Sequence, residues 1–143
     1  MVKTRSSRIM LLGDFFTKEG KASSNINPGH FVEFGGTNDL QKQSSANEVV
    51  RPAIALDNTL EGKTLNDEYV EGDHVVYGVA YTGCEVQVKL PANAAAVVKG
   101  DKLAMNGDGC VKKWTTGHVV GFALESIDNS AGSTEVFINM EIL

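Results

Sequence analysis

Short runs in which apolar and polar residues alternate follow one another along most of the chain. Residues 85–90 (Glu-Val-Gln-Val-Lys-Leu) alternate strictly, which is the period of a strand with one buried face. Similar runs, rich in β-branched and aromatic residues, cover 30–34, 49–56, 75–81, 102–105, 110–114, 118–124 and 134–143. The pattern predicts an all-β protein, a sandwich or barrel of about eight short strands.

The segments between these runs predict the connections. Asn-Gly-Asp-Gly at 106–109 tolerates positive φ and predicts a hairpin, and Gly83 predicts another hairpin between 75–81 and 85–90. Residues 37–48 and 57–69 are polar and predict loops, whereas 91–98 contains four alanines and predicts a short helical turn.

The first 27 residues lack a clean period. An apolar patch at 9–12 and 15–16 is followed by a polar stretch rich in Ser and Asn, which favour turns over helix. We therefore expect an extended N-terminal arm at 1–27 and a β-barrel domain at 28–143. The arm interpretation implies that residues 1–17 can be removed without unfolding the protein. The three cations among the first thirteen residues are compatible with a solvated terminus or with docking on an acidic partner: Lys3, Arg5 and Arg8.

Length, charge and hydropathy narrow the class of protein. A chain of 143 residues fits one domain with a hydrophobic core of its own. The net charge of −5 argues against a nucleic-acid coat, because binding phosphates needs a basic surface. The apolar run at 9–12 is too short for a signal peptide or a membrane span, so we expect no membrane partner. Cys84 and Cys110 form no CxxC motif, and we expect both to be reduced in a cytoplasmic setting.

One sequence unit recurs. Pro-Gly-His-Phe-Val at 28–32 opens a segment that closes with Ala-Ile-Ala-Leu-Asp at 53–57. Lys-Gly-Asp-Lys-Leu at 99–103 opens another that closes with Gly-Phe-Ala-Leu-Glu at 121–125, and 71–75 repeats the opening turn. The match at both ends favours a pseudo-repeat, although glycine turns before strands are common in any β protein.

No constellation of catalytic residues is recognisable, and we expect the protein not to be an enzyme. The chain has neither a GxSxG nucleophile motif nor a phosphate-binding glycine loop. It also lacks the Ala-Gly-x-Asp-Leu and Arg-Ser-Gly elements of trimeric dUTPases. His30, His74 and His118 have no closely spaced ligand partner, so we interpret them as exposed turn residues. A metal gathered by histidines around a trimer axis is the less favoured alternative, and we expect no metal and no cofactor.

The order of these elements resembles the capsid decoration (cement) proteins of tailed bacteriophages. The resemblance covers residues 26–143 and rests on Pro-Gly followed by an apolar strand, a later Ala-Leu-Asp, a Gly-Asp-x-Val strand, Val-Gly-Phe-Ala-Leu-Glu and a terminal alternating strand. It implies a β-tulip or small barrel that forms homotrimers on the outer surface of the expanded head. It further implies a structural virion protein, made in the host cytoplasm, that stabilises contacts between major capsid protein subunits.

The arm would then carry the capsid contact. We expect its cations to face acidic capsid surface and its apolar residues to be buried in a groove or at the base of the trimer; alternatively, a strand of the arm would add to a capsid sheet. The predicted contact set is Lys3, Arg5, Arg8, Leu11, Leu12, Phe15 and Phe16. The alternative is a carbohydrate- or receptor-binding β module on the virion surface, which would need Tyr77, Tyr81 and Trp114 on one exposed face.

Overall fold

The computed structural model describes residues 6–35 and 39–143, and its regular structure is almost entirely β. The described residues form eleven strands and one short 3₁₀ helix, η1. In chain order they are β1 (Met10–Leu12), β2 (Phe15–Lys21), β3 (Val32–Gly35), β4 (Asp39–Lys42), β5 (Ala53–Ala55), η1 (Thr59–Glu61), β6 (His74–Ala80), β7 (Glu85–Leu90), β8 (Lys102–Met105), β9 (Val111–Lys113), β10 (Gly121–Ala123) and β11 (Val136–Ile142). The all-β prediction is confirmed, and the count of about eight strands is too low.

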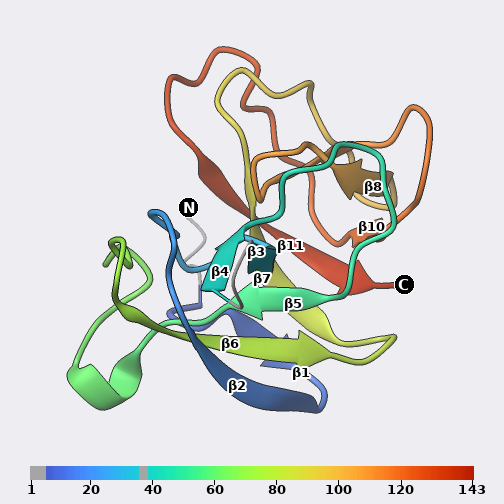
Figure 1. Ribbon diagram of the computed structural model, residues 1–143. Helices are drawn as coiled ribbons and strands as arrows, with labels where there is room; N and C mark the ends of the chain where they lie inside the picture. The colour runs from blue at the N-terminus through green and yellow to red at the C-terminus, as the bar shows by residue number, and fades with distance from the viewer. Residues whose placement is uncertain (1–5, 36–38) are drawn as a thin grey trace.

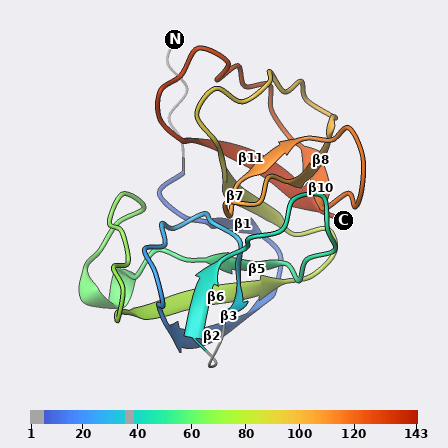
Figure 2. The same cartoon turned by 45° about the horizontal axis from the view of Figure 1, so that its top comes forward.

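The strands form a sandwich in which the first half of the chain lies against the second. The larger sheet has the order β1-β7-β11-β10-β8-β9, and the smaller ones are β2-β6-β5 and the hairpin β3-β4. In Figures 1 and 2 the sheet β2-β6-β5 lies below the six-stranded sheet, with β1 between its own partner β7 and β2. The main core fills the space between them and includes Phe31 and Ile54 from the first half and Val88 and Ile138 from the second.

The loop predicted at 37–48 is wrong in part, because it contains β4, and two further predicted connections also differ from the structure. The turn at Gly83 joins β6 to β7, but these strands belong to different sheets and do not pair, so the predicted hairpin is wrong. Instead, the N–H of Gly83 donates to the carbonyl of Ile142. The predicted helical turn at 91–98 is also wrong, because the segment is irregular and its Val97 forms a β-bridge with Ile127.

The hairpin at 106–109 is confirmed, with β8 and β9 paired on either side of it. The N–H of Asn106 donates to the carbonyl of Cys110 at 2.9 Å.

The pseudo-repeat is confirmed by the hydrogen bonds at its two ends. In the first half Gly29 N–H donates to Ala55 O at 2.9 Å, and Ala55 N–H donates back to His30 O. In the second half Gly100 N–H donates to Ala123 O at 2.8 Å, and Ala123 N–H donates back to Asp101 O. Both glycines have φ near +93°, a conformation that favours glycine at each opening turn.

The repeat extends well beyond the segments that the sequence indicates. A β-bridge from Phe31 to Ile54 places the hairpin β3-β4 beside β5, so the first half has the order β2-β6-β5-β3-β4. The second half has the order β7-β11-β10-β8-β9, which is the same arrangement of consecutive strands. The chain is therefore an internal duplication of a five-stranded unit, about residues 15–80 and 85–142, with β1 added at the edge of the second unit.

The segment predicted to be an arm is part of these sheets from residue 9 onward. β1 pairs with β7, and β2 pairs with β6 along its whole length. Ile9 is fully buried in the main core, and the side-chain amide of Gln87 donates to the carbonyls of Ser6 and Arg8. An extended arm does not describe residues 10–21, because β1 and β2 pair with β7 and β6 within the β-sandwich.

Candidate functional site

The structure separates the residues that were predicted to contact the capsid. Lys3 and Arg5 lie outside the described residues. Arg8 and Phe15 line a cleft, and Leu11 is half-buried on β1. Leu12 and Phe16 are exposed at the corner where β1 turns into β2. The set is therefore not one continuous surface.

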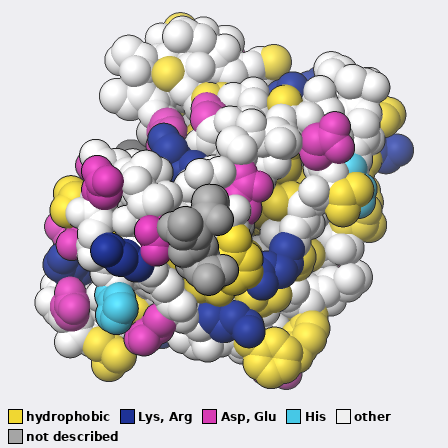
Figure 3. Space-filling view, in the orientation of Figure 1, with side chains coloured by type: hydrophobic (Ala, Val, Ile, Leu, Met, Phe, Trp, Pro, Cys, Tyr) yellow, Lys and Arg dark blue, Asp and Glu magenta, His cyan; other side chains and the backbone are white. Residues whose placement is uncertain are grey.

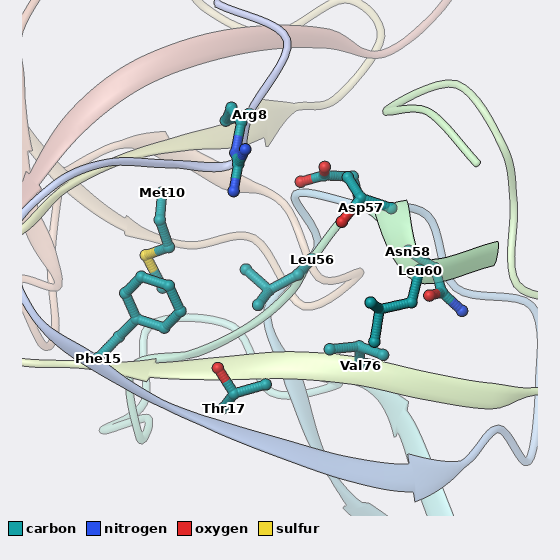
Figure 4. A pocket seen from close by; sticks show the side chains of 10 residues that line it. Arg8, Met10, Phe15, Thr17, Leu56, Asp57, Asn58, Leu60 and Val76 are labelled. Atoms are coloured by element: carbon teal, nitrogen blue, oxygen red, sulfur yellow. The ribbon is translucent and has the colours of Figure 1, made fainter. Parts of the chain in front are cut away.

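The cleft lies between the N-terminal segment and the chain that follows β5. Its volume is about 240 Å³, and Figure 4 shows Met10, Phe15, Leu56 and Val76 converging on its interior. Polar groups, among them Arg8 and Asp57, stand at its rim. A second hollow of about 440 Å³ continues from it and shares Arg8, Asp57 and Thr59.

The lining of this cleft combines apolar and charged side chains. Its ten lining residues include the oppositely charged Arg8 and Asp57. An apolar interior of this size with oppositely charged groups at the rim can receive a side chain from a partner. Leu60, on η1, is 92% exposed beside it and enlarges the apolar surface.

A second candidate surface is the corner formed by Leu12, Phe16 and Tyr81. These side chains are 61%, 58% and 49% exposed, respectively. The rings of Phe16 and Tyr81 meet edge to face with centroids 5.5 Å apart. Figure 3 shows hydrophobic side chains gathered at the bottom of the molecule, over the start of β2 and the end of β6. Neighbouring exposed aromatic residues of this kind are typical of interaction sites.

A third cluster lies where the two halves meet, with two of its three residues buried. His30, from the opening turn of the first half, is 1% exposed, so the interpretation of His30 as an exposed turn residue is wrong. Its Nε2 lies 2.8 Å from Oε1 of Glu135, which directly precedes β11. The thiol of Cys110 donates to the other carboxylate oxygen of Glu135 at 3.2 Å. Sequence patterns could not identify this cluster, because His30 and Glu135 are 105 residues apart.

The donor set of this cluster resembles a metal site, since the three ligand atoms lie within 4.8 Å of one another. Nδ1 of His30, however, accepts the backbone N–H of Asn27 at 3.0 Å. A histidine that binds a metal through Nε2 normally carries a proton on Nδ1 and donates it to an oxygen. A proton on Nδ1 of His30 would point at the hydrogen of the Asn27 N–H, so Nδ1 is unprotonated here. The geometry therefore fits a hydrogen-bond network in which the Nε2–H of His30 donates to Glu135.

This hydrogen-bond network shifts the pKa values of Glu135 and Cys110. Burial alone would raise the pKa of Glu135, but the hydrogen bonds from His30 and Cys110 outweigh it and hold the pKa at about 2. Burial, together with the nearby carboxylate of Glu135, raises the pKa of the Cys110 thiol well above its ordinary value. Cys110 is therefore a protonated donor and not a nucleophile at neutral pH.

This predicts an acid-sensitive contribution of Glu135 to stability. Its carboxylate is ionised in the folded protein down to about pH 2 but takes up a proton near pH 4.5 when unfolded. The contribution is thus fully present above pH 4.5 and is lost as the pH falls toward 2. We expect Glu135→Gln to lower the free energy of unfolding by about 1–3 kcal/mol at pH 7 and by almost nothing near pH 2. Urea denaturation at several pH values measures this, and a deficit independent of pH would contradict it.

The aromatic residues of the glycan-binding alternative are not on one exposed face. Tyr77 is only 2% exposed and belongs to the core of the first half. Trp114 follows β9 in the second half, where Lys102 covers its ring at 5.1 Å from the centroid. Tyr81 alone of the three is exposed, so the three-residue platform is not formed.

Comparison with known proteins identifies the fold. No protein-family description and no curated protein matches the sequence. Among solved structures, the crystal structure of the N base of head fiber gp8.5 of bacteriophage phi29 is similar to this chain with a TM-score of 0.60. The two are 15% identical, and the similarity covers 91% of this chain and 95% of that chain. The protein therefore shares the fold of a phage head fiber base over nearly its whole length. Among the described residues no helix is long and apolar enough to cross a membrane.

Proposed function

We propose that this protein is a structural virion protein that binds the outer surface of an expanded phage head and stabilises contacts between major capsid protein subunits. The observation that carries the proposal is the fold shared with a phage head fiber base along nearly the whole of both chains. The sequence resemblance to phage decoration proteins supports the same conclusion independently of that structure.

The proposed mechanism is preferential binding to one state of the lattice. A protein that binds the expanded lattice and not the unexpanded one stabilises the expanded state by mass action. A homotrimer would strengthen this effect, because several modest contacts made at once act with avidity. The trimer is part of the proposal, and its subunits would each present the same surfaces to the capsid.

The capsid contact that we propose is the corner of Leu12, Phe16 and Tyr81. Its apolar side chains are exposed without a covering element among the described residues, and burial of such groups drives association. Of the cations predicted for this contact, Arg8 is described, exposed and at the rim of the cleft. This changes the role expected of the N-terminal segment: it presents side chains from a folded surface instead of reaching out as a flexible arm.

Co-sedimentation of the purified protein with heads of its own phage tests the proposal. We expect saturable binding to expanded heads that lack the protein and no binding to unexpanded proheads. The double variant Phe16→Ser, Tyr81→Ser should weaken binding by about tenfold or more, since each buried aromatic anchor contributes 1 kcal/mol or more to an interface. Val49→Ser, which also removes an exposed apolar side chain but outside the candidate surfaces, is the matched control and should bind like the wild type. Failure of the wild-type protein to bind either form of head would overturn the proposal.

A further inference from the structure

The internal duplication identifies a strand edge that is occupied in the second half and open in the first. In the second half β1 pairs with the outer edge of β7, on the side away from β11. The strand in the equivalent place of the first half is β2, which pairs with β6 on one side. At its other side β4 approaches only the end of β2, through a bridge between Ala22 and Leu40. No described strand pairs with the rest of that edge, residues 15–19.

The register shows which residues of β2 and β7 correspond. Ala55 and Ala123 are equivalent, because both close the glycine turns described above. Ala55 faces Tyr77, which faces Lys18, whereas Ala123 faces Met140, which faces Val86. Lys18 therefore corresponds to Val86, and Glu19 to Gln87.

This correspondence shows which backbone groups of β2 lack a partner strand at the open edge. The backbone N–H of Gln87 donates to the carbonyl of Ile9 at 2.7 Å and so fixes β1 on β7. Along β2 the N–H of Ala22 donates toward the β6 side, to Asp73. Since successive residues of a strand point their hydrogen-bonding groups to opposite sides, Thr17 and Glu19 point theirs away from β6. No described backbone group pairs with these two positions.

We infer that the open edge of β2 binds an extended segment of the major capsid protein, which adds to the sheet as β1 adds to β7. The inference rests on the proposed function and names how the head is bound. Backbone pairing of this kind provides affinity, and side chains beside the edge provide specificity. The exposed Phe16 and Lys18 lie on one face of β2, so the segment is expected to carry an apolar residue and an acidic residue two positions apart.

A second copy of this chain fits the edge less well than a capsid segment does. Antiparallel self-pairing centred on Lys18 or on Glu19 would place two like charges directly opposite each other, and self-pairing centred on Thr17, the middle of the open edge, would place Lys18 opposite Phe16 without an acidic partner. Exposed charges on an edge strand are also a common means of preventing self-association. The edge is therefore suited to a partner of different sequence.

Substituting proline for Glu19 tests whether head binding depends on backbone pairing at this edge or only on side-chain contacts. Proline removes the outward N–H and is tolerated where that group faces solvent at an edge. We expect Glu19→Pro to bind expanded heads about tenfold or more weakly than the wild type in co-sedimentation. Glu19→Ala, which keeps the N–H and removes the carboxylate, should bind within about twofold of the wild type. Circular dichroism and the thermal midpoint confirm that each variant is folded.

Hydrogen exchange provides a second readout on the unmodified protein. The amides of Thr17 and Glu19 should exchange rapidly in the free protein and become protected about tenfold or more on expanded heads. If the wild type binds heads but these amides stay unprotected and Glu19→Pro binds equally well, the edge inference is wrong while head binding stands. If the wild type does not bind heads at all, the proposed function fails as well. Protection of these amides in the free protein that increases with its concentration would show that a second copy occupies the edge, and would also overturn the inference.

Discussion

Removing residues 1–17 is expected to unfold the protein, which is the opposite of what a free arm would predict. Ile9 is completely buried in the main core, and β1 completes the edge of the six-stranded sheet. The deletion also removes Phe15, which packs against the same core, and the first half of the β2–β6 pairing. Loss of a buried isoleucine to alanine alone costs about 2–5 kcal/mol, a large part of the stability of a domain of this size.

Urea denaturation followed by tryptophan fluorescence measures this effect through Trp114, the only tryptophan of the chain. We expect no cooperative transition for the deletion variant, and a loss of about 2–5 kcal/mol for Ile9→Ala. Arg8→Ala is the matched control, because the neighbouring Arg8 is exposed and should change stability by about 0.5 kcal/mol or less. A deletion variant that unfolds cooperatively at the wild-type midpoint would restore the interpretation of 1–17 as a separate arm.

Gly121→Val is expected to destabilise the protein strongly for a different reason. Gly121 lies on β10 between β8 and β11, and a Cβ atom there would overlap the carbonyl oxygen of Glu141 and the terminal methyl group of Met140. Because a backbone oxygen in a central strand cannot move aside cheaply, we expect a loss of about 3 kcal/mol or more. That corresponds to a fall in the melting temperature of about 10 °C.

Thermal unfolding by circular dichroism checks this prediction. Ala95→Val, which adds β-branched bulk in the exposed loop after β7, is the control and should leave the melting temperature within about 2 °C of the wild type. The equivalent position of the first half is Ala53, which is fully buried, so the duplicated units differ in how closely this strand packs. An unchanged melting temperature in Gly121→Val would show that β10 and β11 can separate at no cost.

The sequence predicts strands that have a clear apolar pattern or a clear turn at their end, and it fails where both are missing. β7 and β8 have the predicted bounds, because polar and apolar residues alternate in 85–90 and the short apolar run 103–105 ends at the Asn-Gly turn. β2 was missed because most of its residues are exposed, so that Phe-Phe-Thr-Lys-Glu-Gly-Lys shows no alternation. Its strand conformation is imposed by β6, which lies about 60 residues further along the chain.

The predictions for the candidate sites also failed where contacts between distant parts of the chain decide how a residue is placed. A glycine–histidine turn such as Gly29-His30 favours an exposed side chain, and only the distant Glu135 explains why His30 is buried. Phe15 and Phe16 are adjacent in the sequence, yet Phe15 faces the core and Phe16 faces solvent, because successive residues of a strand point to opposite faces. The predicted contact set could not be divided correctly before β2 was known to be a strand.

The repeat was visible in the sequence only where its turns require particular residues. The opening glycines and the closing Ala-Leu pairs are similar, whereas β2 and β7 share no pattern. The remaining strands of the repeat were identified from the sheet order and the hydrogen-bond register, because hydrogen-bond pairing is preserved where side chains have diverged.

A cryo-electron microscopy comparison of expanded heads with and without the added protein tests the central claim most directly. The proposed function predicts additional density on the outer surface of the capsid, fitted by the two-unit sandwich with Leu12, Phe16 and Tyr81 facing the major capsid protein. Absence of added density at saturating protein, or density that contacts the capsid through the opposite end of the molecule, would contradict it.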